Sequence, residues 1–350
     1  MAVYLILWLI SFLNAVFTPR KLKLSGIFFI SFLFYFFIIF RGETVDRDYL
    51  TYLKYIDDIK AGDIPTLGGW LFDNIVSLYI YIGIPSFFII AFYALSLPIK
   101  ISLFLKASTT YGSNYLGSVF LVYVGFFVYL HDFTQIRASL AIAIAYYAVY
   151  FMIELKAVKK AWLIMGVSIF VHPSLVVLSI VAFALRKVSF VVLLFILVFS
   201  VIGCYLDIFN VAVNIIVTYL NIPILLIYQG LSQEGVDTIN VFGLFPLFNL
   251  AIAFIACFYG VRYKIGEPWI EFMLKCSIIS QIVWFALSAI PGFSGRISQI
   301  FLFSFVFVIP YISQKIIKNT WGLSALYSMV GLAAFLFKGK LLNDYSFIFW

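Results

Sequence analysis

The chain has 350 residues, of which 65% are hydrophobic and only 11% are charged. Soluble globular proteins carry about 25% charged residues, so this composition excludes that class. A net charge of +8 would indicate nucleic acid as a partner of a soluble domain, but here the basic residues form short clusters between apolar runs, where they set membrane orientation. The sequence predicts an all-α, polytopic integral membrane protein in contact with membrane lipid and not with nucleic acid.

Apolar runs occur along the whole chain, and a transmembrane helix needs roughly 20 mostly apolar residues. Ordinary spans are predicted at residues 2–17, 25–40, 86–105, 113–131, 135–154, 188–206, 244–261, 269–290, 297–313 and 321–337. The first run has no basic residue before it and no small-residue cleavage site after it, so we interpret it as a retained span. We expect about 10–12 transmembrane helices in a single membrane domain, 1–350.

The stretch 161–185 differs from these runs because "VHPSL" interrupts its middle. Basic residues flank both of its ends: Lys159, Lys160, Arg186 and Lys187. Since basic residues tend to remain cytoplasmic, we expect both ends on one face. Proline breaks a helix, and non-helical backbone at membrane depth is tolerated where it lines a cavity. The pattern predicts a broken or re-entrant hairpin with His172 and Pro173 near the bend.

The orientation follows from basic clusters that all fall on one face, which we predict to be cytoplasmic. These are Arg20/Lys21/Lys23, Lys100/Lys106, Lys156/Lys159/Lys160, Arg186/Lys187, Arg262/Lys264 and Lys315/Lys318. Two sizeable external loops, 41–85 and 207–243, then lie outside together with the short segments 131–134 and 291–296. The tail with Lys338 and Lys340 is an exception, because it would also lie outside.

Four polar segments fall on the predicted outer face. They contain Arg41, Asp48, Tyr49 and Tyr52 in "RGETVDRDYLTY", Gln135 and Arg137 in "HDFTQIR", His172 and Ser174 in "VHPS", and Arg296 in "GFSGRISQ". Arginine binds phosphate through two parallel hydrogen bonds and keeps its charge, and an imidazole titrates near neutrality. Arg137, Arg296 and His172 together therefore predict proton transfer beside a bound pyrophosphate.

Structural interpretations remain open for several of these residues. Arg41 is also typical of an anchor that reaches the membrane surface from a helix end, and Asp46, Arg47 and Asp48 of a solvated ion-pair cluster. His172 is also compatible with a hydrogen-bonded interior histidine. Asp132 with Gln135 three residues later has the spacing of a helix capping box, so we leave Asp132 out of the candidate site. The cysteines, Cys204, Cys257 and Cys276, have no metal-site spacing, and we expect no metal or cofactor.

The order "R…DYxxY", "QIRASLAIAI", "FVHPSL" and a late "R…F…P" (Arg296, Phe301, Pro310) resembles the EpsG branch of the Wzy-type bacterial polysaccharide polymerases. The resemblance implies a multi-pass enzyme of the bacterial inner membrane that acts at its periplasmic or outer face. Such an enzyme polymerises O-antigen, capsule or exopolysaccharide from oligosaccharides linked to undecaprenyl diphosphate. A chain-length regulator and a flippase of the same pathway are the further partners that it implies.

On this resemblance the chain is a metal-independent, inverting glycosyltransferase whose catalytic residues are His172, Arg137 and Arg296. His172 is the general base, and the two arginines stabilise the departing diphosphate. Substrate binding falls to Arg41, Asp48, Tyr49, Tyr52, Gln135 and Ser174. Two other functions stay open: a lipid-linked oligosaccharide flippase, for which we find no paired halves, and an O-antigen ligase. A structural membrane subunit would leave the outer-face arginines replaceable.

Overall fold

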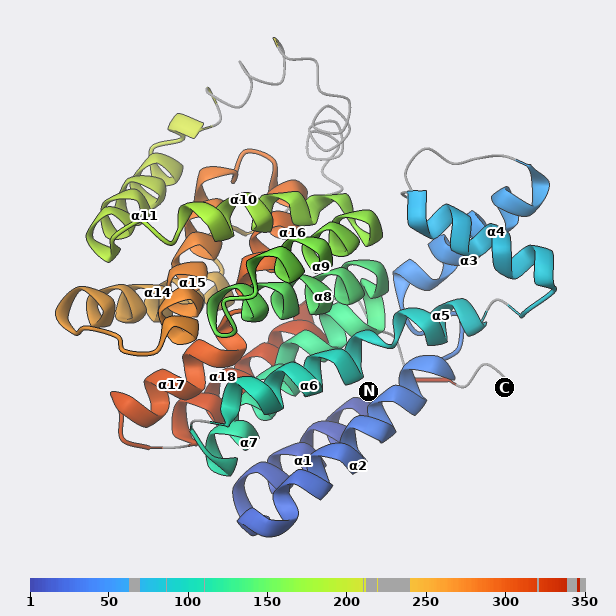
Figure 1. The fold of residues 1–350 in the computed structure, drawn as a ribbon, viewed down its shortest axis with the longest axis horizontal. Helices are drawn as coiled ribbons and strands as arrows, with labels where there is room; N and C mark the ends of the chain where they lie inside the picture. Colours follow the sequence, from blue (N-terminus) through green and yellow to red (C-terminus); the bar gives the residue numbers. More distant parts are fainter. Residues whose placement is uncertain are drawn as a thin grey trace. The chain divides into compact units, whose positions relative to one another are not determined.

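The computed structural model describes residues 1–62, 70–85, 87–109, 111–209, 211, 219, 240–319, 321–338 and 345–346 (Figure 1). The regular elements in these residues are helices. The chain divides into two compact units, one of Met1–Ser179 with Ile309–Trp350 and one of Ile180–Val308. The protein is an all-α, multi-pass membrane protein, as its composition predicted.

The first unit is built from both ends of the chain. Its helices are α1 (Ala2–Phe17), α2 (Arg20–Ile39), α3 (Arg47–Ala61), α4 (Trp70–Ile82), α5 (Phe87–Tyr93), α6 (Ser96–Ser108), α7 (Ser113–Val122), η1 (Tyr123–Thr134), α8 (Ile136–Ile153), α9 (Val158–Val171), η2 (Pro173–Leu175), α18 (Gly322–Ala333) and η3 (Ala334–Lys338). The indole N–H of Trp8 in α1 donates to the Ser328 hydroxyl in α18 at 2.7 Å. The Gly42 N–H donates to the Ser346 carbonyl at 2.7 Å, so residues 320 and 304 apart in sequence close this unit.

The second unit contains α11 (Phe190–Tyr205), α14 (Leu244–Arg262), α15 (Pro268–Ala286) and α16 (Pro291–Leu302). Here α15 packs against α11, α14 and α16. Two further helices, α10 (Val176–Ala184) and α17 (Phe305–Lys315), run across the division between the units. Most of the predicted external loop 207–243 lies outside the described residues. The other predicted loop, 41–85, holds α3 and α4.

Six helices among the described residues are long and apolar enough to span a membrane: 20–39, 88–108, 113–134, 136–153, 244–262 and 268–286. Each lies on a predicted span. The apolar helices at 2–17, 190–205 and 322–336 are shorter. The span predicted at 297–313 is not a regular helix, because α16 and α17 meet there at a bend of 53°; the pair is apolar enough to be a broken span or a re-entrant segment. Hydropathy counts composition over a window and therefore does not detect a bend between two apolar helices.

The predicted break in 161–185 is present at His172. The backbone of His172 is extended, with φ −150° and ψ 109°, between the end of α9 and the short helix η2. A residue before proline avoids the helical region, and Pro173 is well placed as the first residue of the next helix. The break thus follows from the His-Pro pair, whereas the common face of its two ends stays a prediction.

Candidate functional site

The helix that ends beside the candidate site is wound more loosely than an α-helix. In η1 the backbone bonds to the fifth residue back, and at its end the Gln135 N–H donates to the Leu130 carbonyl at 3.2 Å. Gln135 has φ −87° and ψ 54°, which separates η1 from α8. The predicted capping box at Asp132 is therefore wrong, because η1 continues to Thr134 and α8 begins only at Ile136. Such π-helical segments are rare in proteins, and those that do occur often lie at functional sites.

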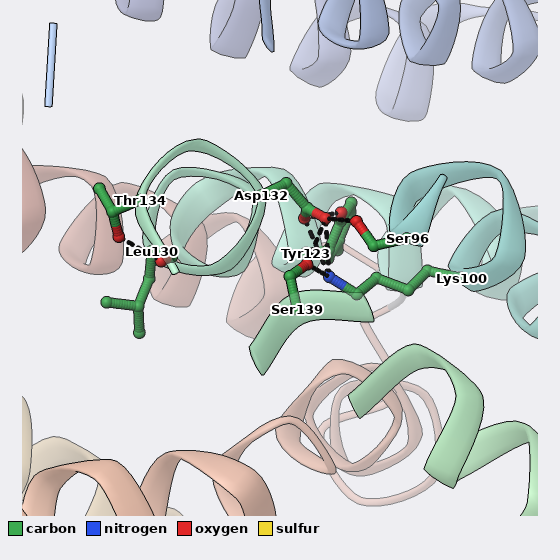
Figure 2. Close-up of polar contacts among 7 residues, drawn as sticks. All are labelled: Ser96, Lys100, Tyr123, Leu130, Asp132, Thr134 and Ser139. Carbon is green, nitrogen blue, oxygen red and sulfur yellow. Dashed lines mark hydrogen bonds and ion pairs between the residues drawn. The ribbon is translucent and has the colours of Figure 1, made fainter. Parts of the chain in front are cut away.

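Asp132 in η1 is fully buried and is the centre of a polar network (Figure 2). Its two carboxylate oxygens accept from the Lys100 ammonium at 2.9 and 3.0 Å. Ser139 of α8 donates to it at 2.6 Å, and the hydroxyls of Ser96 and Tyr123 also donate to it. Lys100 donates in addition to the Ser139 hydroxyl at 2.7 Å. The network joins α6, η1 and the first turn of α8.

This network saturates the carboxylate. An ionised carboxylate has about four acceptor positions, and Asp132 has four side-chain donors. A carboxylate in this state has no acceptor position left for a substrate proton, so the arrangement indicates a structural role. Isolated buried charge is very costly, and this pairing is what makes Asp132 tolerable at depth.

The same pair corrects the predicted role of Lys100. Lys100 was counted with the cytoplasmic cluster and residues 131–134 with the outer face, yet the two side chains touch and neither is exposed. Both groups therefore lie at one depth inside the bundle. A lysine whose charge is matched by a carboxylate is not held at the membrane surface, so it does not report orientation.

A second buried ion pair lies between α2 and α3. Arg41 Nε donates to Asp46 Oδ2 at 2.7 Å, and both side chains have zero exposure. Asp46 also caps α3 by accepting from the Tyr49 N–H at 2.9 Å, and the Arg41 guanidinium lies 5.1 Å from the Tyr49 ring. Burial raises the pKa of Asp46, and Arg41 opposes that rise. The interpretations of Arg41 as a surface anchor and of Asp46 as a solvated ion are therefore wrong.

Arg137, in the first turn of α8, lies against the aromatic residues of α3 and α4. Its guanidinium carbon is 4.6 Å from the Phe72 ring and 5.5 Å from the Tyr52 ring. Burial raises the pKa of Tyr52 to about 12 although the neighbouring Arg137 acts to lower it. The Tyr52 phenol therefore keeps its proton at neutral pH. Asp48, half-buried on α3, is also close enough to raise the pKa of Tyr52.

His172 and Ser174 contact each other. The Ser174 hydroxyl lies 2.7 Å from His172 Nδ1. A loop of four residues, 154–157, joins α8 to α9, which pack closely as an antiparallel pair (Figure 1). Because α8 rises about 1.5 Å per residue, the end of α9 lies level with the first turns of α8, and η2 contacts α8. His172 is thus placed at the same end of this helix pair as Arg137.

Arg296 belongs to the second unit, where it is an exposed residue of α16. Of the predicted site residues, the structure brings together Arg137, Tyr52 and Asp48, places Arg41 against Tyr49, and places Ser174 on His172. Gln135 lies between η1 and α8, two residues from Arg137. That Arg296 joins these residues stays a prediction, as do the catalytic and binding roles.

The sequence reasoning missed the partners of Asp132, although a signal was present. Lys100 and Asp132 each interrupt an apolar run, and an ionisable group inside a span is by default a candidate for a functional or paired residue. The hydroxyls of Ser96, Tyr123 and Ser139 gave no comparable signal, because such residues are common in membrane helices.

Comparison with known proteins agrees with the predicted resemblance. The model of the EpsG family matches residues 24–349 of the chain. No curated protein and no solved structure matches it. The match covers η1, the Asp132 network, Arg137 and the His172 break. The chain therefore belongs to the EpsG family.

Proposed function

We propose that the chain is a polysaccharide polymerase that uses oligosaccharide repeat units linked to undecaprenyl diphosphate. It acts at the outer, periplasmic face of the bacterial inner membrane. Membership of the EpsG family supports a polymerase-like function. The observation that supports an anionic substrate is the position of Arg137 beside the Phe72 and Tyr52 rings. A guanidinium keeps its charge and can hold two oxygens of a phosphate through parallel N–H groups, and here it is also hydrogen-bonded to Tyr52.

The reaction moves the growing glycan onto an incoming unit. The hydroxyl oxygen of the non-reducing sugar attacks the anomeric carbon of the growing chain. The bond between that carbon and the diphosphate oxygen breaks, and the diphosphate leaves with the electron pair. Direct attack of this kind inverts the anomeric centre. Arg137 stabilises the charge that develops on the diphosphate, and a second cation is the role that the sequence predicts for Arg296.

His172 takes the proton of the attacking hydroxyl. With the Nδ1 proton donated to the Ser174 hydroxyl at 2.7 Å, Nε2 is the atom that accepts the proton. Ser174 in this account orients the imidazole, as a second group commonly orients a catalytic base. This differs from the direct substrate contact that the sequence predicted for Ser174.

Asp48, Tyr52 and Tyr49 bind the sugar in this proposal. Tyr52 keeps its hydroxyl proton and can donate it to a sugar oxygen, while the half-buried Asp48 accepts from sugar hydroxyls. Arg41 and Gln135 complete the set: Arg41 holds the start of α3 through Asp46, and Gln135 lies where η1 gives way to α8. Since Arg41 is enclosed, its contribution to substrate binding passes through α3.

The test is Arg137→Lys in the purified full chain, assayed with lipid-linked repeat units and read as product length on a gel. Lysine keeps the charge but not the two-pronged geometry, so we expect single repeats to accumulate. Arg262→Lys, at an exposed position in the last turn of α14, is the matched control and should polymerise normally. Normal product from Arg137→Lys would show that Arg137 only packs against aromatic rings and does not bind the diphosphate.

A flippase and an O-antigen ligase are distinguished in cells that lack the gene. A missing polymerase leaves single-repeat lipid-linked units at the outer face, and a missing flippase leaves them at the inner face. A missing ligase leaves polymer of normal length on the lipid carrier. We expect the first pattern.

A further inference from the structure

A groove between α2 and α6 is not used by the proposed reaction. It has a volume of about 500 Å³ and is lined by Phe28, Ser31, Phe32 and Tyr35 on α2 and by residues between 97 and 105 on α6. Phe28 and Phe32 are 50% and 63% exposed. The groove therefore opens on the surface of the first unit and offers its occupant mainly carbon.

The hydroxyls in the groove are already engaged by the protein. Ser31 donates to the Ile27 carbonyl at 2.7 Å, Tyr35 lies 3.4 Å from the Ala91 carbonyl, and the hydroxyls of Ser102 and Tyr147 are 3.3 Å apart. An occupant of this groove gains apolar contact and not hydrogen bonds. The lining on α6 spans eight residue steps, roughly 12 Å of helix, which is close to the half-thickness of about 15 Å of one hydrocarbon leaflet.

One end of the groove is strongly basic. Lys106 follows the last lining residue of α6, and its ammonium lies 5.0 Å from the Tyr147 ring and 6.0 Å from the Phe151 ring. The Lys160 ammonium approaches Phe151 from α9, at 4.5 Å. Two cations from different helices thus flank one aromatic ring, and Ser102 connects this end to the groove through Tyr147.

The charges around this end favour an anion. Lys156 on the connection to α9 and Lys159 in the first turn of α9 add two exposed cations, and Glu154 on the connection is the opposing carboxylate. Four lysines against one glutamate leave a net charge of +3. Lysines near a membrane surface attract anionic lipid headgroups.

This end lies far from the proposed reaction. The contacts between α6 and α8 rise in residue number along both helices: Lys100 contacts Ser139, and Lys106 contacts Phe151. The two helices therefore run parallel. Phe151 is 14 residues beyond Arg137 on α8, which is roughly 21 Å. A phosphate at Lys106 therefore cannot be the one that Arg137 holds.

We propose that the groove and its lysine end form a binding site for one anionic phospholipid. An acyl chain lies between α2 and α6, and the phosphate headgroup lies at Lys106 and Lys160. The lipid belongs to the leaflet at the C-terminal end of α8, opposite to the leaflet of the proposed reaction. Bound there, it holds α2 against α6, which carries Lys100 of the buried network.

The test is native mass spectrometry of the full chain in detergent, titrated with phosphatidylglycerol. We expect the double variant K106Q/K160Q to bind this lipid about 30-fold more weakly, since two headgroup contacts are lost. Zwitterionic phosphatidylcholine should bind the parent weakly and be insensitive to that variant. The matched control K54Q/K60Q removes two exposed lysines of α3 and should bind phosphatidylglycerol as the parent does.

A second variant examines the groove separately from the charges. Ser31→Phe fills the groove and should weaken phosphatidylglycerol binding while leaving all the lysines in place. Equal binding of phosphatidylglycerol by K106Q/K160Q and by the parent would overturn the proposal, as would equal binding of the two phospholipids by the parent. Polyprenyl phosphate and phosphatidylglycerol can also be compared as competitors for the bound phosphatidylglycerol. If polyprenyl phosphate displaces it at the lower concentration, the phospholipid is overturned as the occupant.

Discussion

Two buried ion pairs in the first unit have the same chemistry and different reach. Lys100 and Asp132 are 32 residues apart and join three helices, with Asp132 bound by four side chains. Arg41 and Asp46 are five residues apart, and Asp46 is bound by that one side chain and by the backbone of Asp48 and Tyr49 at the start of α3. The first pair sets the packing of helices, and the second sets the direction in which the chain enters α3. Burial alone does not say how far the effect of a charge extends.

The largest effect is expected for Asp132→Asn, which leaves Lys100 buried without its counter-charge. Removing one partner of a buried ion pair costs about 3–5 kcal/mol. We expect a large fall in the free energy of unfolding in mixed micelles, measured by SDS titration. The double variant K100M/D132L should recover much of this loss, because no charge is then left buried. A double variant as unstable as Asp132→Asn would assign the stability to the hydroxyl contacts instead.

Asp46→Ala should have a smaller and more local effect. It removes a charge-assisted hydrogen bond of about 1.5–3 kcal/mol and an N-cap of about 1 kcal/mol, while the enclosed Arg41 loses its counter-charge but keeps its hydrogen bond to the Ile38 carbonyl at 2.7 Å. We expect faster proteolysis within residues 43–61 and a modest change in global unfolding. Asp46→Asn keeps the cap and should lie between this variant and the parent. Global unfolding as severe as that of Asp132→Asn would remove the distinction between the two pairs.

Ser139→Ala sharpens the comparison within the larger network. It deletes one donor to Asp132 and one acceptor of Lys100 but leaves the ion pair intact, so about 1–2 kcal/mol should be lost. Because Ser139 lies two residues after Arg137, polymerisation should fall by more than this stability loss explains. Ser118→Ala, a buried serine of α7, is a control for the general cost of losing a hydroxyl.

Lys60→Ala should change least. Lys60 and Asp57 form an ion pair at 3.0 Å whose side chains are 53% and 70% exposed. Exposed pairs contribute about 0–1 kcal/mol because water and salt screen them. The unfolding curve should overlay that of the parent at 150 mM salt. A loss comparable to that of Ser139→Ala would show that exposure is not what separates these pairs.

The helical class and the main spans were predictable because apolar runs of this length have few alternatives in a membrane. The break at His172 was predictable from its proline, and Arg137 was recognisable as an arginine at the start of a span. The Asp132 network was not, because its members come from positions 96 to 139 and only packing brings them together. The bend between α16 and α17 was also missed, since composition is the same on both of its sides. The grouping of Arg137 with Tyr52 and Phe72 required α3 and α4, which the sequence showed only as a loop.

The closure of the first unit by Ser328 and Ser346 has a consequence for the order of synthesis. Residues 180–308, the second unit, are synthesised before residues 321–346. During that interval Trp8 of α1 lacks Ser328, Gly42 lacks the Ser346 carbonyl, and the surfaces of α7 and η1 that pack against α18 are uncovered. Contacts of long sequence separation form late and leave intermediates open to misassembly. The N-terminal helices therefore lack their C-terminal partners until the second unit has been made. We expect a membrane insertase that shields these helices during that time to raise the yield of folded protein.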